Sequence, residues 1–365
     1  TLYDDLPADE LYKSHNNSFL KYKNTSSKCL VYVFFDRETQ LFEKSELSLI
    51  QELTMSKQIY FSFVIAALSF ITVKRIQKAG IDHYQFLQTL FHKENGWFNF
   101  KKPDLILNLP FELREISGLT NLPENQIACV QNENGIIFIY NLDKDSIIGQ
   151  FQFGIDGDYE GLSRVDSTYF LLRSDATLLE VSSPWDTATV SETKLNLPAW
   201  DNEGLCFDER DNRLLIAPKS KLGKGPEFKD TRAIYSIDLT SKELNEAPLF
   251  LISIAEIESF ANAHNLELPQ KVNKQSQDSI SSLKFMPSSL AVHPKSDDIY
   301  IISAVDQTMA VFNKAGKLLN YMRLDPKLFN KPEGITFLEN GDMIITNEGQ
   351  MGVPTLLRFN WLKLD

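Results

Sequence analysis

The chain has 365 residues, of which 43% are hydrophobic, 24% charged and 11% aromatic, so it can form a sizeable globular core and is not disordered or collagen-like. Its 37 basic and 49 acidic residues give a formal net charge of −12, and no basic run offers the surface that nucleic acid requires. Cys29, Cys129 and Cys206 lie far apart without CxxC or paired histidine spacing, which excludes a disulfide framework and a zinc site. We interpret Cys129 and Cys206 as small buried hydrophobes.

Residues 1–54 form an N-terminal extension without a chemical motif. The segment LVYVFF (30–35) predicts a strand, and residues 43–53 have the pattern of an amphipathic helix. The expectation is a small α/β or helical region. It is either a genuine small domain or sequence upstream of the natural start, because Met55-Ser56-Lys57 resembles a translation start.

Residues 59–73 (IYFSFVIAALSFITV) contain no charge and are flanked by lysine and arginine. Fifteen residues are short of the roughly 20 that span a bilayer and match the core of a signal sequence, although a buried helix fits as well. We interpret 55–75 as a signal or membrane anchor. Since no AxA-like cleavage site or lipidation cysteine follows, the uncleaved form is favoured. The orientation is left open, and 76–102 is interpreted as a linker.

A repeat of about 43 residues begins after this linker. The aligned segments are ISGLT (116–120), YEGLS (159–163), NEGLC (202–206), PSSLA (287–291) and PEGIT (332–336). Short strands separated by polar turns such as Asp211-Asn212 and Asn340-Gly341 follow them. Four short antiparallel strands at this period predict a β-propeller over 103–365.

The step from Glu203 to Ser288 is about twice the others, so it holds either a degenerate sixth blade or an insertion. Residues 255–282 contain a helical stretch and a polar tract rather than alternating strands, which favours five blades with an insertion there. After Glu333 too few residues remain for four strands. We therefore expect residues 104–109 to complete the last blade and close the ring.

The first strands and the ends of the second strands meet at one rim of a propeller. The aligned rim positions are Ser117, Glu160, Glu203, Ser288 and Glu333. Three carboxylates around one channel repel each other, and a bound hard cation is the simplest neutralising partner. Calcium takes six to eight oxygen ligands. We therefore predict a calcium site of Glu160, Glu203, Glu333, Asp158, Asp201 and Glu348.

Two alternatives to the cation are left open. Lys219 occupies the corresponding second-strand end of the third blade and could balance the carboxylates itself. The glutamates could instead hydrogen-bond the backbone of the neighbouring blade and hold the ring together. A lysine-rich loop, 219–230, is expected on the same face as the rim, together with the insertion, and suggests a small anionic ligand bridged by the cation.

Catalytic signatures are missing from the sequence. It contains no GxSxG, HExxH, Walker or GxGxxG motif, and its five histidines are scattered and interpreted as surface or capping residues.

The repeats resemble the SdiA-regulated, YjiK-like family of bacterial β-propellers over roughly Pro103–Trp361. The resemblance rests on the order Ser, Glu, Glu, Ser, Glu at the rim, on EISGL (115–119), NEGL (202–205) and PEGI (332–335), on Lys219, and on Asn347-Glu348. It implies a cell-envelope protein that is anchored in the inner membrane near its N-terminus and faces the periplasm, or is secreted there. The family is similar to β-propeller phytases and has been linked to calcium. Residues 1–54 and the insertion depart from its pattern.

The leading hypothesis is thus an anchored envelope propeller that binds a hard cation, with Ser117, Glu160, Glu203, Lys219, Ser288 and Glu333 contacting a small anionic ligand. The alternatives are a phytase-like, metal-dependent phosphoesterase and a protein-interaction scaffold without a small-molecule site.

Overall fold

The computed structural model describes residues 10–13, 17–23, 30–36, 98–273 and 278–362. The chain divides into two compact units, Thr1–His83 and Tyr84–Asp365. In the first unit, β1 (Glu10–Lys13), β2 (Asn17–Lys23) and β3 (Leu30–Asp36) form an antiparallel sheet in the order β1-β2-β3. The strand predicted over 30–35 is therefore confirmed. The helix expected over 43–53 and the apolar segment 59–73 lie outside the described residues.

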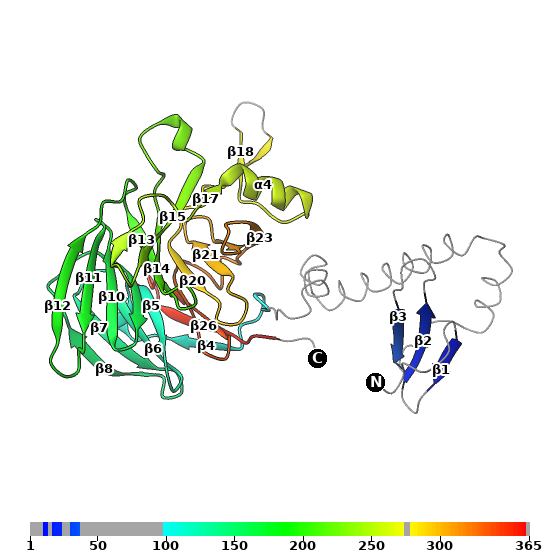
Figure 1. Ribbon diagram of the computed structural model, residues 1–365, viewed down its shortest axis with the longest axis horizontal. Coiled ribbons are helices and arrows are strands. Elements are labelled where there is room, and N and C mark those ends of the chain that lie inside the picture. The colour runs from blue at the N-terminus through cyan, green and yellow to red at the C-terminus, as the bar shows by residue number, and fades with distance from the viewer. Residues whose placement is uncertain (1–9, 14–16, 24–29, 37–97, 274–277, 363–365) are drawn as a thin grey trace. The chain divides into compact units, whose positions relative to one another are not determined.

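The second unit is a five-bladed β-propeller (Figure 1), and the described part of the 255–282 insertion contains no sixth blade. The first blade contains β5 (Ile116–Leu122), β6 (Gln126–Gln131), β7 (Ile136–Asn141) and β8 (Ser146–Gln152). The second contains β9 (Tyr159–Val165), β10 (Thr168–Arg173), β11 (Thr177–Ser182) and β12 (Thr189–Lys194). The third contains β13 (Asn202–Asp208), β14 (Arg213–Pro218), β15 (Thr231–Asp238), β16 (Glu243–Leu244) and β17 (Phe250–Ser253).

The fourth blade contains β20 (Ser289–Val292), β21 (Ile299–Ser303), β22 (Thr308–Phe312) and β23 (Leu318–Arg323). The fifth contains β24 (Pro332–Phe337), β25 (Met343–Asn347), β26 (Thr355–Phe359) and β4 (Leu105–Asn108). The inner strands β5, β9, β13, β20 and β24 contact one another in this order, and β24 contacts β5 to close the ring.

The ring closes as the sequence predicts. β4 pairs antiparallel with β26, with Leu105 opposite Arg358 and Asn108 opposite Thr355. A strand from the start of the propeller thus supplies the outer edge of the last blade, so the circle is fastened by backbone hydrogen bonds. Phe98, within the stretch interpreted as a linker, is buried and packs against Trp361, which places the first described residues of this unit inside its core.

The hairpin turns follow the predicted chemistry. Asn212 has φ 47° and Gly341 has φ 99°, both in the left-handed region that asparagine and glycine tolerate. Tight spacing of the inner strands explains the glycine that follows each rim glutamate. A Cβ atom built on Gly161 would lie 2.6 Å from Leu205 Cβ and 2.9 Å from Glu203 O, so a side chain here would push two blades apart.

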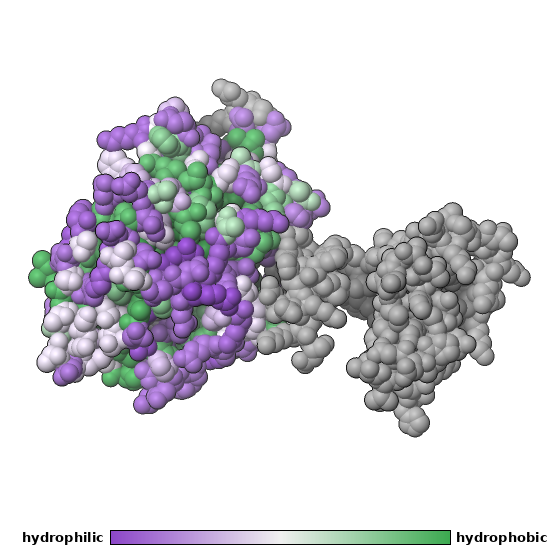
Figure 2. Space-filling view, viewed as in Figure 1, coloured by the Kyte–Doolittle hydropathy of each residue, from purple (hydrophilic) through white to green (hydrophobic). Residues whose placement is uncertain are grey.

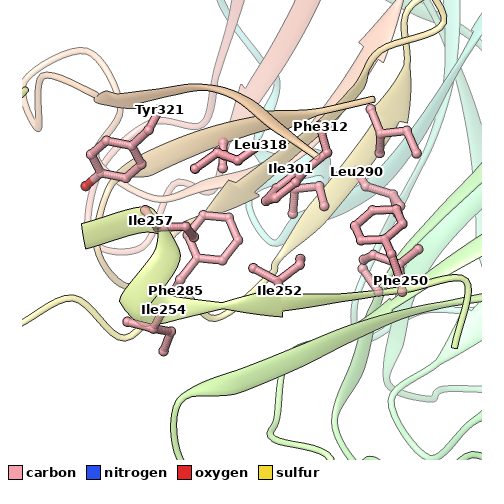
Figure 3. Packing of buried hydrophobic residues seen from close by; sticks show 14 of the residues in the cluster. Phe250, Ile252, Ile254, Ile257, Phe285, Leu290, Ile301, Phe312, Leu318 and Tyr321 are labelled. Atoms are coloured by element: carbon pink, nitrogen blue, oxygen red, sulfur yellow. The ribbon is translucent and has the colours of Figure 1, made fainter. Parts of the chain in front are cut away.

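The insertion is packed onto the third and fourth blades rather than standing free. It contains α4 (Ile254–Ala263), which confirms the predicted helical stretch. It also contains a hairpin of β18 (Gln270–Val272) and β19 (Ser279–Ser281), which the sequence analysis did not predict. Ile254 and Ile257 of α4 join a buried cluster with Phe250, Phe285 and Tyr321 (Figure 3). Ser253 caps the helix by accepting from Glu256 N.

The apolar residues are concentrated inside and between the blades. Hydrophilic residues cover much of the face seen in Figure 2, with smaller apolar areas between them, as expected of a chain with a net charge of −12. Cys129 and Cys206 are buried free thiols, as predicted. Burial raises the pKa of the Cys129 thiol to about 12, so it is inert at neutral pH.

Candidate functional site

The five aligned positions lie at one rim, at or beside the starts of the inner strands. At the end of the second strand in four blades, a backbone N–H donates to the carbonyl oxygen two residues before the rim residue of the same blade. The pairs are Asn132 N to Glu115 O (3.1 Å), Ser174 N to Asp158 O (3.0 Å), Lys219 N to Asp201 O (2.7 Å) and Glu348 N to Lys331 O (3.0 Å). First-strand starts and second-strand ends therefore meet as the repeat predicts. We call this end of the channel, with its acidic side chains and their partners, the glutamate rim.

The two serines of the rim fasten neighbouring blades. Ser117 Oγ donates to Tyr159 O over 2.7 Å, and Ser288 Oγ donates to Pro332 O over 3.0 Å. Each bond joins one inner strand to the start of the next. The role of holding the ring together, which was one alternative for the glutamates, is therefore performed by the serines.

Glu203 is buried and forms an ion pair inside its own blade. Lys219 Nζ lies 2.5 Å from Glu203 Oε1, and only 4% of Glu203 is exposed. Although burial opposes the charged form, the Glu203 carboxylate raises the pKa of Lys219 well above its ordinary value. Burial and Glu333 nevertheless raise the pKa of Glu203 to about 8 despite this lysine. Lys219 thus balances one carboxylate, in agreement with the first of the two alternatives to a cation.

Glu333 has a basic partner that the sequence analysis missed. Lys331 Nζ lies 3.5 Å from Glu333 Oε1 and also pairs with Glu348. Lys331 occupies the same repeat position as Asp158 and Asp201, two residues before the rim glutamate, so aligning that position would have revealed it. Burial raises the pKa of Glu333, and Lys331 acts in the opposite direction.

Glu160 differs from the other two glutamates because no ion pair to a basic side chain forms within the described residues. Burial, followed by the Glu203 and Asp158 carboxylates, raises the pKa of Glu160 from 4.5 to about 9. Glu333 also contributes to this shift. The three glutamates therefore interact electrostatically across the channel. Glu160 and Asp158 are the acidic residues of the rim that no basic side chain neutralises among the described residues.

The remaining predicted ligands lie around these pairs. Asp158 is exposed and accepts a hydrogen bond from Ser174, while Asp201 is exposed at φ 58° and raises the pKa of Glu203. Glu348 is buried, and its hydrogen bond with Glu115 is the largest contribution to raising the pKa of Glu115 to about 7. The rim is thus a connected set of carboxyl groups with two lysines among them.

Several buried oxygens near the rim lack a hydrogen-bond donor in the described part of the chain. They are the Oδ1 atoms of Asn132, Asn202 and Asn347 and the Oε2 atom of Glu333. Unpaired buried acceptors are costly, and carboxylate and amide oxygens are the donors that hard cations prefer. The chemistry of the set therefore fits calcium. The spacing does not form a ready metal centre, because no three acidic, histidine or cysteine side chains within the described ranges are grouped to hold an ion.

Two longer segments flank the site. The loop from Lys219 to Asp230, which contains η2 (Pro226–Phe228), projects on the same side of Figure 1 as the insertion. The two segments are tied together, since Ile254 N donates to Asp230 O over 2.9 Å and Arg232 Nη2 donates to Lys284 O over 2.7 Å. Lys224 Nζ lies 4.8 Å from the Trp200 ring centre.

Fold and rim together define a five-bladed propeller with a charged, oxygen-rich opening at one end of its channel. No protein-family model matches the sequence, and no curated protein matches it. Solved propellers are similar in fold: Myxococcus xanthus glutaminyl cyclase covers 72% of this chain and 97% of its own, at 11% identity and a TM-score of 0.46. A streptogramin B lyase covers 73% and 99%, at 12% identity and a TM-score of 0.40. At these values the activities of those proteins do not transfer to this chain.

Proposed function

We propose that this protein is an envelope β-propeller that binds a hard cation, calcium first among them, at the glutamate rim. The observation that supports the proposal most directly is Glu160, a half-buried carboxyl without an ion-pair partner among the described residues, whose pKa neighbouring carboxylates help to raise. A cation that replaces the Glu160 proton would relieve this repulsion. Neutral oxygens near the rim, including those of Asn132 and Asn202, could complete the shell.

The lysines near the rim determine which charge a second ligand of the cation site can carry. Lys219 and Lys331 already pair with Glu203 and Glu333, so the two charges of a bound divalent ion would match those of Glu160 and Asp158. Further lysines stand on the adjoining loop, at positions 221, 224 and 229. A small anion that contacts the ion and this loop is therefore the co-ligand that we propose.

Calcium titration of the full chain tests the cation site. We expect saturable heat of binding. Proton release should be largest near pH 6 and fall as the pH rises through 8 to 9, because the ion must displace the protons of Glu160 and Glu203 until these groups ionise on their own. Glu203→Gln should weaken calcium affinity at least tenfold, whereas Glu246→Gln, at an exposed site, should leave it unchanged. The absence of saturable binding, or equal affinity in wild type and Glu203→Gln, would contradict the proposal.

The envelope location rests on the family resemblance and on residues 59–73, which lie outside the described residues. Within the described ranges no helix has both the length and the apolar character needed to cross a membrane. Cell fractionation is expected to recover the full chain with membranes, resistant to high salt and released by detergent. Recovery in the soluble cytoplasmic fraction would refute this part of the proposal.

A further inference from the structure

A second opening lies at the other end of the channel. A cavity of about 460 Å³ is lined by residues from the later parts of all five inner strands and from the turns that follow them. It is formed, for example, by Asn121, Ser163, Phe207, Val292 and Thr336, one from each blade. We call it the distal pocket. Its volume is in the range that holds small molecules.

Three hydroxyl groups occupy equivalent places in the distal pocket. Thr120, Ser163 and Thr336 each follow a rim residue by three positions, and all three residues are buried. Within the described residues none of the three hydroxyls makes a hydrogen bond. Cys206 and Ala291 complete this level of the ring. The cavity wall therefore presents three hydroxyl donors from three different blades.

Arg164 adds a positive charge at the edge of this wall. It directly follows Ser163, is half-buried, and lines the cavity. The structure gives it no ion pair with an acidic side chain among the described residues. Its one resolved electrostatic effect is on Tyr169, whose pKa it lowers against the effect of burial. A half-buried guanidinium without a counter-ion attracts an oxyanion and can bind it through two parallel N–H groups.

The other charged groups around the pocket are already paired or exposed. Asp208 is bound by Arg213 Nε at 2.9 Å and by Lys314 Nζ at 2.8 Å. Arg210 pairs with Asp297, while Glu209 and Glu339 are exposed, where water and salt screen their charge. His293 is buried and its pKa is lowered to about 4, so it is neutral at physiological pH.

We propose that the distal pocket binds a small molecule through a carboxylate or phosphate group, with Arg164 and the Ser163, Thr120 and Thr336 hydroxyls as donors. This site is separate from the glutamate rim and needs no cation. Its ligand is expected to carry an apolar part next to this group, because the apolar side chains of Leu119, Leu162 and Ile335 also line the cavity.

Titration of the full chain with inorganic phosphate and with acetate, followed by NMR in the presence of EDTA and at constant ionic strength, tests the proposal. We expect saturable binding of at least one of the two anions, and the stronger binder identifies the group that the pocket prefers. Arg164→Gln should weaken that binding at least tenfold, and Ser163→Ala should weaken it severalfold. Lys327→Gln removes the same charge from an exposed position outside both sites and should leave the affinity unchanged.

Thermal unfolding of each variant separates lost binding from lost folding. Saturable binding that Arg164→Gln abolishes, with its melting temperature within a few degrees of wild type, supports the proposal. If Arg164→Gln unfolds, the Ser163→Ala affinity decides in its place. The proposal is overturned if neither anion binds to the wild type, or if Arg164→Gln folds and binds the anion as tightly as the wild type. Because EDTA removes calcium, failure of the rim site would not affect this result.

Discussion

A chain that begins at Pro110 is expected to lose cooperative unfolding, whereas a chain that begins at Trp97, and so keeps the buried Phe98, retains it. The two differ by β4 and its flanking residues. The shorter chain loses the pairing of β4 with β26 and the burial of Leu109, whose N–H donates to Pro354 O over 2.8 Å. Leu107, packed against the same cluster, is lost as well. The cost is at least about 5 kcal/mol, from two leucine side chains and an unpaired strand edge.

Urea unfolding followed by circular dichroism and by tryptophan fluorescence measures this difference. Coincident transitions are expected for the longer chain, and a broad or absent transition for the shorter one. Two chains of equal stability would show that the fifth blade does not depend on β4. Because both chains lack the first unit, any contribution of residues 1–83 cancels in the comparison.

Glu160→Gln is expected to stabilise the protein at pH 9 and to leave its stability at pH 5 unchanged. The folded protein holds the Glu160 proton up to a pKa of about 9, whereas the unfolded chain releases it near 4.5. Below pH 4.5 this proton makes its full contribution to the free energy of unfolding, and that contribution is lost as the pH rises from 4.5 toward 9. Glutamine cannot ionise, so the variant does not lose this stability as the pH rises. Allowing for partial exposure, the gain at pH 9 is about 3 kcal/mol.

The measurement is the free energy of unfolding in urea at pH 5, 7 and 9, without added divalent ions. Glu246→Gln, which is exposed, serves as the matched change of charge and is expected to follow wild type at every pH. If the free energy of unfolding of the wild type were the same at pH 5, 7 and 9, this result would contradict the crowding of carboxyl groups at the rim. Added calcium should narrow the gap between the variant and wild type at pH 9.

The repeat was sufficient to predict the architecture because each blade is built from local strands and turns. The spacing between Glu160 and Glu203 equals the length of one blade. Because too few residues follow Glu333 for four strands, the last blade was predicted to take its fourth strand from residues 104–109. The third blade was harder to predict, since its outer position is shared by β16 and β17, both paired with β15. Such a division depends on packing with the neighbouring insertion and has no periodic signal.

The partners at the rim were predicted only in part. Lys219 was identified because it stands alone at an aligned second-strand end, and its contact with Glu203 agrees with that expectation. Lys331 was missed because it breaks an otherwise acidic or neutral repeat position. The distal pocket was not anticipated either, because its polar residues are ordinary threonine and serine whose lack of partners becomes visible only in three dimensions.

The mixed origin of the fifth blade constrains how the molecule matures on the ribosome. Leu105 is synthesised before all five inner strands, but its partner Arg358 is made only after them. Until β26 has been made, β4 has no pairing partner in the nascent chain, while the four earlier blades can already assemble. The ring can therefore close only after β26 has been made, and a chaperone that binds earlier would meet an open, incomplete ring.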